Sequence, residues 1–289
     1  MKNIGKYEPV VERQTRFLSI RGVKYCINEW GDKDAPLLFY LHGWADTGSN
    51  FQFVADALGP HWRIIAPDWR GFGRSTCNAK AYWFPDYLAD LHELLGMYSD
   101  GVPVTIIGHS MGANVACLYA GILPERVRSI INIEGFGLPD SDPTDAPLRY
   151  RKWLKASETT PVFQSYPDFA SLAVKIRKRS PSLSEEQADF VAREWASDID
   201  GTVRLQANPM HKLPTANLYR RAEATACWRN ISAQMLLVCG GKSPFADQLS
   251  NFEATLNSPS KSCTLPEVGH MIHFEAPEGL AREIEAFLK

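Results

Sequence analysis

The stretch VTIIGHSMGANVACLYA, residues 104–120, is the most informative part of the sequence. Residues 104–107 are apolar or β-branched and predict a buried strand, whereas residues 113–120 predict a helix. Between them, GHSMG at 108–112 predicts an abrupt turn with Ser110 at its centre. Glycines two residues either side of the serine fit this turn, because a side chain there would collide with the neighbouring strand or helix. The stretch therefore predicts a strand, a strained turn and a helix that present a nucleophilic serine.

Length and composition predict a large folded domain. The chain has 289 residues, of which 45% are hydrophobic, and a chain of this length can bury an extensive core. Its 31 basic and 33 acidic residues give a formal net charge of -2, so no whole-chain field attracts nucleic acid or acidic membranes. We therefore expect a small-molecule acyl substrate and no nucleic-acid partner. The sequence leaves open whether the chain forms a homo-oligomer.

No segment predicts a membrane span, because no stretch approaches the ~18 apolar residues that a span requires. Residues 1–16 lack the apolar run of about 7 residues that a signal peptide needs, so we expect a cytoplasmic protein. The cysteines are far apart and never form a C-x-x-C pair, which argues against a zinc site or a redox dithiol. They are Cys26, Cys77, Cys117, Cys227, Cys239 and Cys263.

Strand-like and helix-like stretches alternate along much of the chain. Strands are expected at 17–21, 23–29, 37–41, 62–67, 127–133, 235–239 and 262–265. Helices are expected at 50–58, with Asn50 as the N-cap, and at 84–98, 245–256 and 277–288. This alternation predicts an α/β fold with a mainly parallel sheet, opened by an antiparallel hairpin.

Between Leu138 and Asn230 the pattern changes. No strand-like run is recognised there, and several stretches have the helical spacing of apolar residues. One of them begins with Ser184 and Gln187 in the arrangement of a capping box. We therefore predict a helical cap at 138–230, inserted into a core domain made of residues 1–137 and 231–289.

Three loops follow predicted strands at the edge where open α/β sheets bind ligands. There, Ser110 is the candidate nucleophile and His270 the base that removes and later returns its proton. The backbone N–H groups of Trp44 and Met111 are the candidate oxyanion hole. Aromatic side chains are expected to line an apolar substrate pocket. They are Trp44, Phe136 and Trp83.

Four motifs in this chain resemble those of the α/β-hydrolase family. They are HGW (42–44), DWRGFGRS (68–75), GHSMG (108–112) and PEVGH…HFEAPE (266–278). Together they are far more specific than any one of them. The resemblance implies a mainly parallel eight-stranded sheet flanked by helices, a helical cap inserted after strand six, and a serine hydrolase site beneath the cap. Among relatives, the chain is similar to small capped esterase-like hydrolases and serine-hydrolase-like proteins.

The acid of the triad is where this sequence departs from the family pattern. In many family members it stands three residues after the glycine that ends strand seven, but here Ser243 occupies that place after Gly240. Two carboxylates remain as candidates: Glu134, just after strand six, and Asp247, four residues further along than Ser243. Some relatives carry the acid after strand six, so Glu134 is favoured and Asp247 remains the alternative.

We expect a cofactor-independent serine hydrolase that cleaves an ester or related acyl bond of a small, fairly apolar substrate through an acyl-enzyme. No metal is expected, and Gly71 and Gly73 do not begin a dinucleotide site, because Thr76 replaces the third glycine. Hydrolysis of a C–C bond or a thioester, or a lyase reaction, remains open on the same triad. A ligand-binding protein with a weak or idle triad is the alternative from another class.

Overall fold

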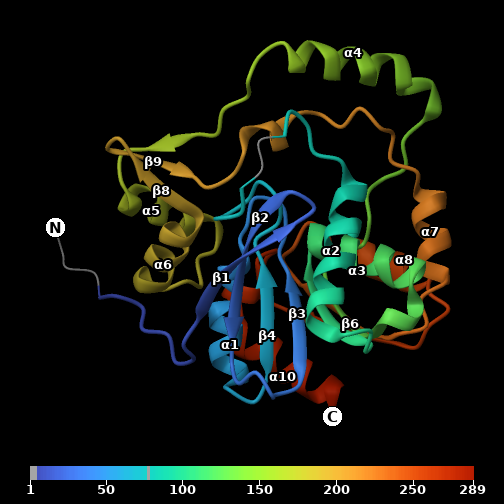
Figure 1. Ribbon diagram of the computed structural model, residues 1–289, viewed down its shortest axis with the longest axis horizontal. Helices are drawn as coiled ribbons and strands as arrows, with labels where there is room; N and C mark the ends of the chain where they lie inside the picture. Colours follow the sequence, from blue (N-terminus) through green and yellow to red (C-terminus); the bar gives the residue numbers. More distant parts are fainter. Residues whose placement is uncertain (1–4, 77–78) are drawn as a thin grey trace.

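The fold is built on an eight-stranded sheet with the strand order β1-β2-β4-β3-β5-β6-β10-β11 (Figure 1). The structure is a computed structural model that describes residues 5–76 and 79–289; Cys77 and the first four residues lie outside these ranges. The strands are β1 (Gln14–Ile20), β2 (Val23–Trp30), β3 (Leu37–Leu41), β4 (Arg63–Pro67), β5 (Val104–His109), β6 (Val127–Ile133), β10 (Gln234–Gly240) and β11 (Ser260–Leu265). The pairs β1/β2 and β2/β4 are antiparallel, and the other pairs are parallel. The mainly parallel sheet and its antiparallel opening are confirmed.

Helices cover both faces of this sheet (Figure 1). One face packs against α1 (Gln52–Leu58) and α10 (Pro277–Leu288). The other packs against α2 (Phe84–Ser99), α3 (Met111–Ile122), α7 (Arg221–Arg229) and α8 (Leu249–Glu253). Successive residues of a strand point to opposite faces, so Ile106 enters one of these cores and Ile107 the other. Covered strands need apolar residues on both faces, which explains the continuous apolar runs.

Two expected helices differ from prediction at their ends. The turn η1 (Gly48–Phe51) precedes α1, and Asn50 does not cap the helix; its amide instead donates to Asp46 Oδ1 at 2.7 Å. The helix expected at 245–256 is divided into a 3₁₀ turn, η5 (Ala246–Gln248), and the short α8. In both places the chain tightens into a 3₁₀ turn, a common feature of helix ends that the apolar spacing does not reveal.

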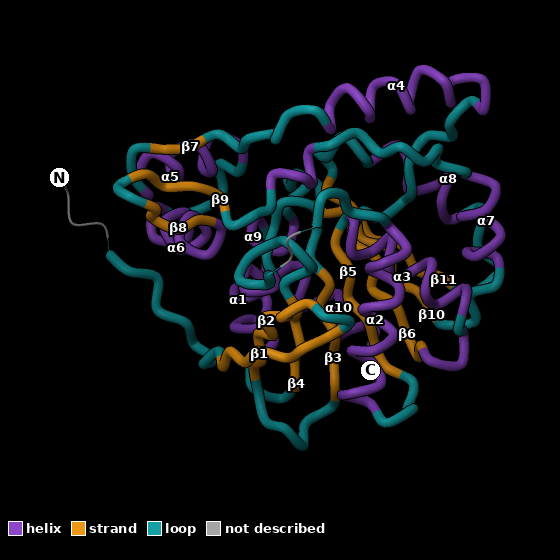
Figure 2. The backbone as a smooth tube through the Cα atoms, turned by 45° about the horizontal axis from the view of Figure 1, so that its top comes forward, coloured by secondary structure: helices purple, strands orange, loops and turns teal. Residues whose placement is uncertain are grey.

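The inserted segment is not entirely helical, and the expectation that it contains no strand is wrong. It contains α4 (Ala146–Ser157), α5 (Phe169–Arg179) and α6 (Glu185–Trp195). It also forms an antiparallel sheet in the order β7-β9-β8, which lies apart from the main sheet (Figure 2). Its strands are β7 (Ser165–Tyr166), β8 (Ala196–Ile199) and β9 (Thr202–Leu205). Strands of two to four residues are too short to show alternation.

The insertion contains one predicted helix start and ends against the core. The capping box of Ser184 and Gln187 is confirmed at the start of α6. At the C-terminal end of the insertion, α7 packs against α3 of the core, where the amide of Asn230 donates to Gly121 O at 2.6 Å. Trp228 of the same helix is buried in the core cluster. The cap boundary at residue 230 stays a prediction, and α7 packs as part of the core.

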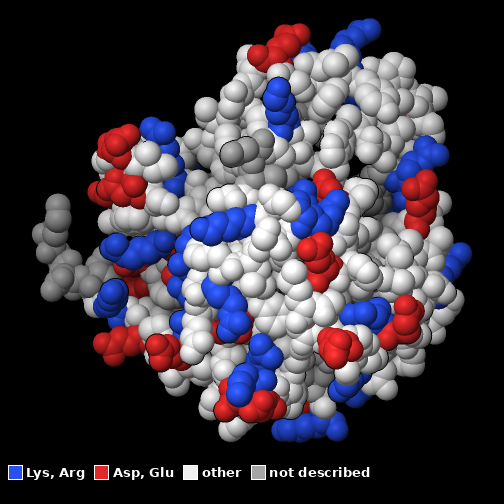
Figure 3. Space-filling model, viewed as in Figure 1, with Lys and Arg blue, Asp and Glu red and all other residues white. Residues whose placement is uncertain are grey.

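The surface carries both signs of charge, with Lys and Arg interspersed among Asp and Glu on the face shown in Figure 3. Among the described residues, no helix is both long and apolar enough to cross a membrane. Cys26, Cys117 and Cys239 are buried, whereas Cys263 is half-buried.

Candidate active site

Ser110 sits in a strained turn between β5 and α3. Its φ of 50° and ψ of -112° lie in a region that residues other than glycine rarely adopt. A Cβ at Gly108 would lie 2.5 Å from the Cα of Ala113, and one at Gly112 would lie 2.1 Å from the carbonyl oxygen of Leu41. Both glycines are therefore required by close backbone contacts, and the turn holds the serine at the carboxyl end of the sheet.

His270 and Glu134 lie in contact, although 136 positions separate them. His270 Nδ1 hydrogen-bonds Glu134 Oε2, and Ser243 Oγ donates to the same oxygen at 2.7 Å. The other oxygen accepts the N–H of Gly240 at 2.8 Å. The Glu134 side chain is fully buried, whereas that of His270 is 27% exposed. Because the carboxylate accepts hydrogen bonds, it favours the proton on Nδ1 and leaves Nε2 free to act as a base.

The turn that carries Glu134 is strained and braced. Glu134 has a φ of 56°, and its N–H donates to Val238 O of the neighbouring strand at 3.2 Å. The side chain of Asn132 accepts the N–H of Gly135 at 2.7 Å and donates to its carbonyl at 3.1 Å. The sequence reasoning missed Asn132, whose signal was a polar residue near the end of an apolar strand. Asp247, the alternative acid, is exposed in η5.

The loop after β3 lies against the serine. A Cβ at Gly43 would approach Ser110 Cβ to 3.3 Å. His42 braces this loop: its Nδ1–H donates to Gly43 O at 2.7 Å, and its Nε2 accepts the N–H of Trp69 at 2.7 Å. Burial lowers the pKa of His42 and so favours this neutral form. Met111 is the first residue of α3, so its N–H has no acceptor within the helix and is available to an oxyanion.

The three aromatic residues predicted for the pocket occupy different environments. Trp44 is 50% exposed, and its ring centroid lies 6.1 Å from that of Phe163 in the inserted segment. Trp83 lies 6.3 Å from Trp153 of α4 by the same measure. Phe136 is buried in the core cluster. Trp44 and Trp83 therefore lie where core and insertion meet, and the pocket role of all three stays a prediction.

A buried group of Asp46, His109 and His273 lies behind His270. His109 Nε2–H donates to the carbonyl of His270 at 3.0 Å, and His273 Nε2 lies 3.0 Å from Asp46 Oδ2. Burial disfavours a charged Asp46, but pairing with His273 outweighs it and lowers the pKa of Asp46. Burial and the neighbouring histidines hold the pKa of His109 well below its ordinary value. His273 is thus fully buried and paired with Asp46.

The same three residues are a candidate set of metal ligands, since one ligand atom from each lies within 4.8 Å of the others. Two histidines and a carboxylate are a ligand set that several transition metals accept. Asp46 is already engaged, because its Oδ1 accepts hydrogen bonds from Asn50 and from Trp195 Nε1, each at 2.7 Å. The observed contacts of this group connect the loop after β3 with the Ser110 turn and with α6.

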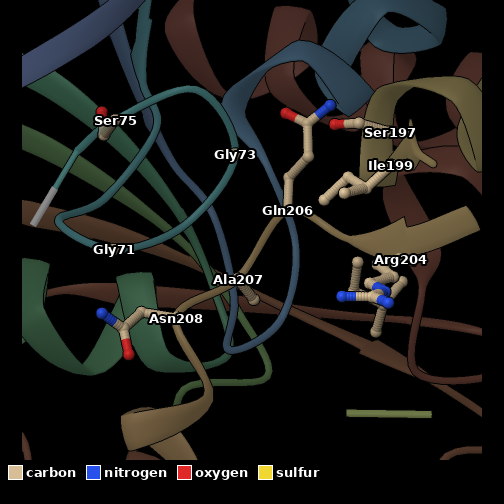
Figure 4. Close-up of a pocket in the computed structure, with 10 residues that line it drawn as sticks. Gly71, Gly73, Ser75, Ser197, Ile199, Arg204, Gln206, Ala207 and Asn208 are labelled. Atoms are coloured by element: carbon tan, nitrogen blue, oxygen red, sulfur yellow. The ribbon is translucent and has the colours of Figure 1, made fainter. Parts of the chain in front are cut away.

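A surface cavity of about 280 Å³ lies between the loop after β4 and the small sheet of the insertion (Figure 4). Its lining includes Gly71, Gly73 and Arg204, but neither Ser110 nor His270. Gly73 N–H donates to Gln206 O at 2.6 Å, which fastens the loop to the insertion. This cavity therefore lies where the core and the insertion meet, and the candidate triad does not line it.

The arrangement matches a known family. A family model described as the alpha/beta hydrolase fold matches residues 36–277. The chain belongs to this α/β hydrolase family. This membership confirms the resemblance inferred from the four motifs, and it makes hydrolysis the expected class of chemistry.

Similar proteins lie within the same family. A serine hydrolase-like protein of Danio rerio is 29% identical over 60% of this chain and 55% of its own length. A second one, from Dictyostelium discoideum, is 26% identical over 76% of this chain and 64% of its own length. The chain thus spans between half and two thirds of the length of these curated relatives. Among solved structures, a thioesterase domain from the curacin biosynthetic pathway has a TM-score of 0.85 and 27% identity, covering 95% of this chain and 99% of that one.

Proposed function

We propose that this chain is a serine hydrolase that cleaves an ester or related acyl bond of a small, fairly apolar substrate through an acyl-enzyme. The observation that carries the proposal is the hydrogen bond between His270 Nδ1 and the fully buried carboxylate of Glu134. A buried carboxylate bound to an imidazole in this way orients the ring and stabilises its protonated form. Ser110, in its strained turn, supplies the nucleophile.

The reaction proceeds in two halves. Ser110 Oγ attacks the acyl carbon while His270 Nε2 takes its proton, and the protonated imidazole then gives that proton to the leaving group. Water repeats the sequence on the acyl-enzyme and releases the acid. The backbone N–H groups of Met111 and Trp44 hold the negative oxygen of each tetrahedral intermediate. Glu134 balances the charge of the imidazolium throughout.

A thioester is the second candidate substrate class, because the thioesterase domain of the curacin pathway is similar to this chain over almost its whole length. A thioester and an oxygen ester with the same acyl group use the same nucleophile and base, and differ in the leaving group. A pair of substrates with one acyl chain and either an alkoxide or a thiolate leaving group therefore distinguishes them. The preferred class is the one with the higher kcat/KM.

The test compares the unaltered protein with Ser110→Ala on p-nitrophenyl esters of several chain lengths and on the matching acyl thioesters. We expect Ser110→Ala to lose activity by about a thousandfold or more. Ser250→Ala, at an exposed serine of α8, is the matched control. A fluorophosphonate should label the unaltered protein and not Ser110→Ala. Unchanged turnover in Ser110→Ala would refute the mechanism, and absence of labelling would favour an idle triad.

A further inference from the structure

Glu134 has a complete set of hydrogen-bond donors, and Ser243 supplies one of them. Oε1 accepts from Gly240 N at 2.8 Å and from Cys239 Sγ at 3.2 Å. Oε2 accepts from Ser243 Oγ at 2.7 Å and from His270 Nδ1. An ionised carboxylate accepts about four hydrogen bonds, and a fully buried one requires them. Ser243 and His270 therefore bind the same oxygen of Glu134. Among the described residues, Glu134 is the only charged group that hydrogen-bonds the imidazole of His270.

The hydroxyl of Ser243 is itself held in place. Its oxygen accepts the N–H of Phe245 at 3.2 Å, which directs the hydroxyl proton towards Glu134. The backbone is fixed as well, because Ser243 N–H donates to Gly240 O at 3.0 Å and its carbonyl accepts from Ala246 at 3.2 Å. Ser243 is buried. A donor fixed on both sides can restrict the rotation of the carboxylate that it binds.

Ser243 reaches Glu134 from the neighbouring strand. β6 and β10 are neighbours in the sheet; Glu134 follows β6 directly, and Ser243 stands three residues after the end of β10. The 2.7 Å between Ser243 Oγ and Glu134 Oε2 is the length of a hydrogen bond, and the same Oε2 contacts His270. Ser243 therefore contacts the carboxylate at the oxygen that binds the imidazole.

We propose that Ser243 is a positioning residue that holds the Glu134 carboxylate for His270. This inference rests on the proposed serine hydrolase function.

The first experiment measures kcat and KM for Ser243→Ala, with Ser243→Thr as the variant that keeps the hydroxyl. We expect Ser243→Ala to lose about five- to thirty-fold in kcat. Its KM should change by less than about two-fold, because the hydroxyl contacts the Glu134 carboxylate. Ser243→Thr should restore kcat, and Ser250→Ala should leave it unchanged. A kcat for Ser243→Ala equal to that of the unaltered protein would overturn the positioning role.

A difference between Ser243→Ala and Ser243→Thr reports the hydroxyl, because both variants keep Glu134 and His109, the ionisable side chains in contact with His270. A general loss of structure would lower the melting temperature and the number of sites titrated by fluorophosphonate, and would leave kcat per titrated site unchanged.

A second measurement separates this inference from the proposed function. If Ser110→Ala retains activity, the proposed function itself fails. If Ser110 is required but Ser243→Ala keeps the kcat of the unaltered protein, only the present inference fails.

Discussion

Replacing Glu134 by Gln tests the acid while keeping the shape of its side chain. The carboxylate faces the N–H of Gly240 and the S–H of Cys239 on one oxygen, and the hydroxyl of Ser243 and Nδ1–H of His270 on the other. A glutamine has one acceptor oxygen and one NH₂ group. Whichever way the amide turns, its NH₂ group meets two donors.

The two orientations have different consequences. If the NH₂ group faces Gly240, it meets a backbone N–H that cannot turn away, and leaving that N–H unpaired costs about 1–3 kcal/mol. If it faces His270, Nδ1 must accept instead of donating, and the imidazole proton moves to Nε2. Nε2 then cannot take the proton of Ser110. We therefore expect kcat to fall by about 10³- to 10⁴-fold, equivalent to about 4–5.5 kcal/mol, as when the acid of a serine protease triad becomes an amide.

The assay is kcat and kcat/KM on one p-nitrophenyl ester, with the melting temperature as a check of folding. Asp247→Asn is the matched acid-to-amide control, and we expect it to stay within about two-fold of the unaltered protein because Asp247 is exposed in η5. A large loss of kcat in Asp247→Asn, with Glu134→Gln still active, would refute the assignment of the acid.

Three further changes test the structure around the site. Gly112→Ala would place a Cβ 2.1 Å from Leu41 O, so we expect a loss of about 2–4 kcal/mol of stability in urea unfolding. An unaltered unfolding midpoint would contradict the tight packing of the Ser110 turn. Trp195→Phe removes the 2.7 Å hydrogen bond to Asp46 Oδ1 and should lower stability by about 1–3 kcal/mol, whereas no change would show that this link is dispensable. Burial lowers the pKa of His211 from 6.5 to about 3, so the unfolded chain binds more protons between these values and stability rises with pH in that window. Going from pH 7 to 4.5, the unaltered protein should lose about 2 kcal/mol more than His211→Phe, and equal losses would refute this.

The main sheet could be predicted from the sequence because its strands are buried on both faces. The strand expected at 127–133 is β6 with the same limits, and the one expected at 37–41 is β3. A continuous apolar run bounded by turn residues is a strong signal for such strands. The turn around Ser110 could also be predicted, because any sequence that forms it needs glycines at the two close backbone contacts.

The small sheet of the insertion gave a weaker signal that lay in its turn. Ile199 pairs with Thr202 across Asp200 and Gly201, and both of these central residues have positive φ. Asp-Gly is among the preferred sequences for a two-residue hairpin of this kind. Its flanking strands are too short and too exposed to alternate, so only the dipeptide marked the hairpin.

The identity of the acid could not be fixed from sequence, because it depends on which strands are neighbours. Position along the chain shows that Glu134 and Ser243 each follow a strand, but the lateral order of those strands comes from pairing between distant segments. In the structure β10 lies between β6 and β11, and His270 comes from the loop after β11. The Glu134 carboxylate therefore passes the end of β10 to contact His270, and Gly240 and Ser243 supply hydrogen bonds along that path. A serine at the position where the family pattern predicts the acid is thus compatible with the proposed triad, because its hydroxyl donates to the carboxylate that comes from the adjacent strand.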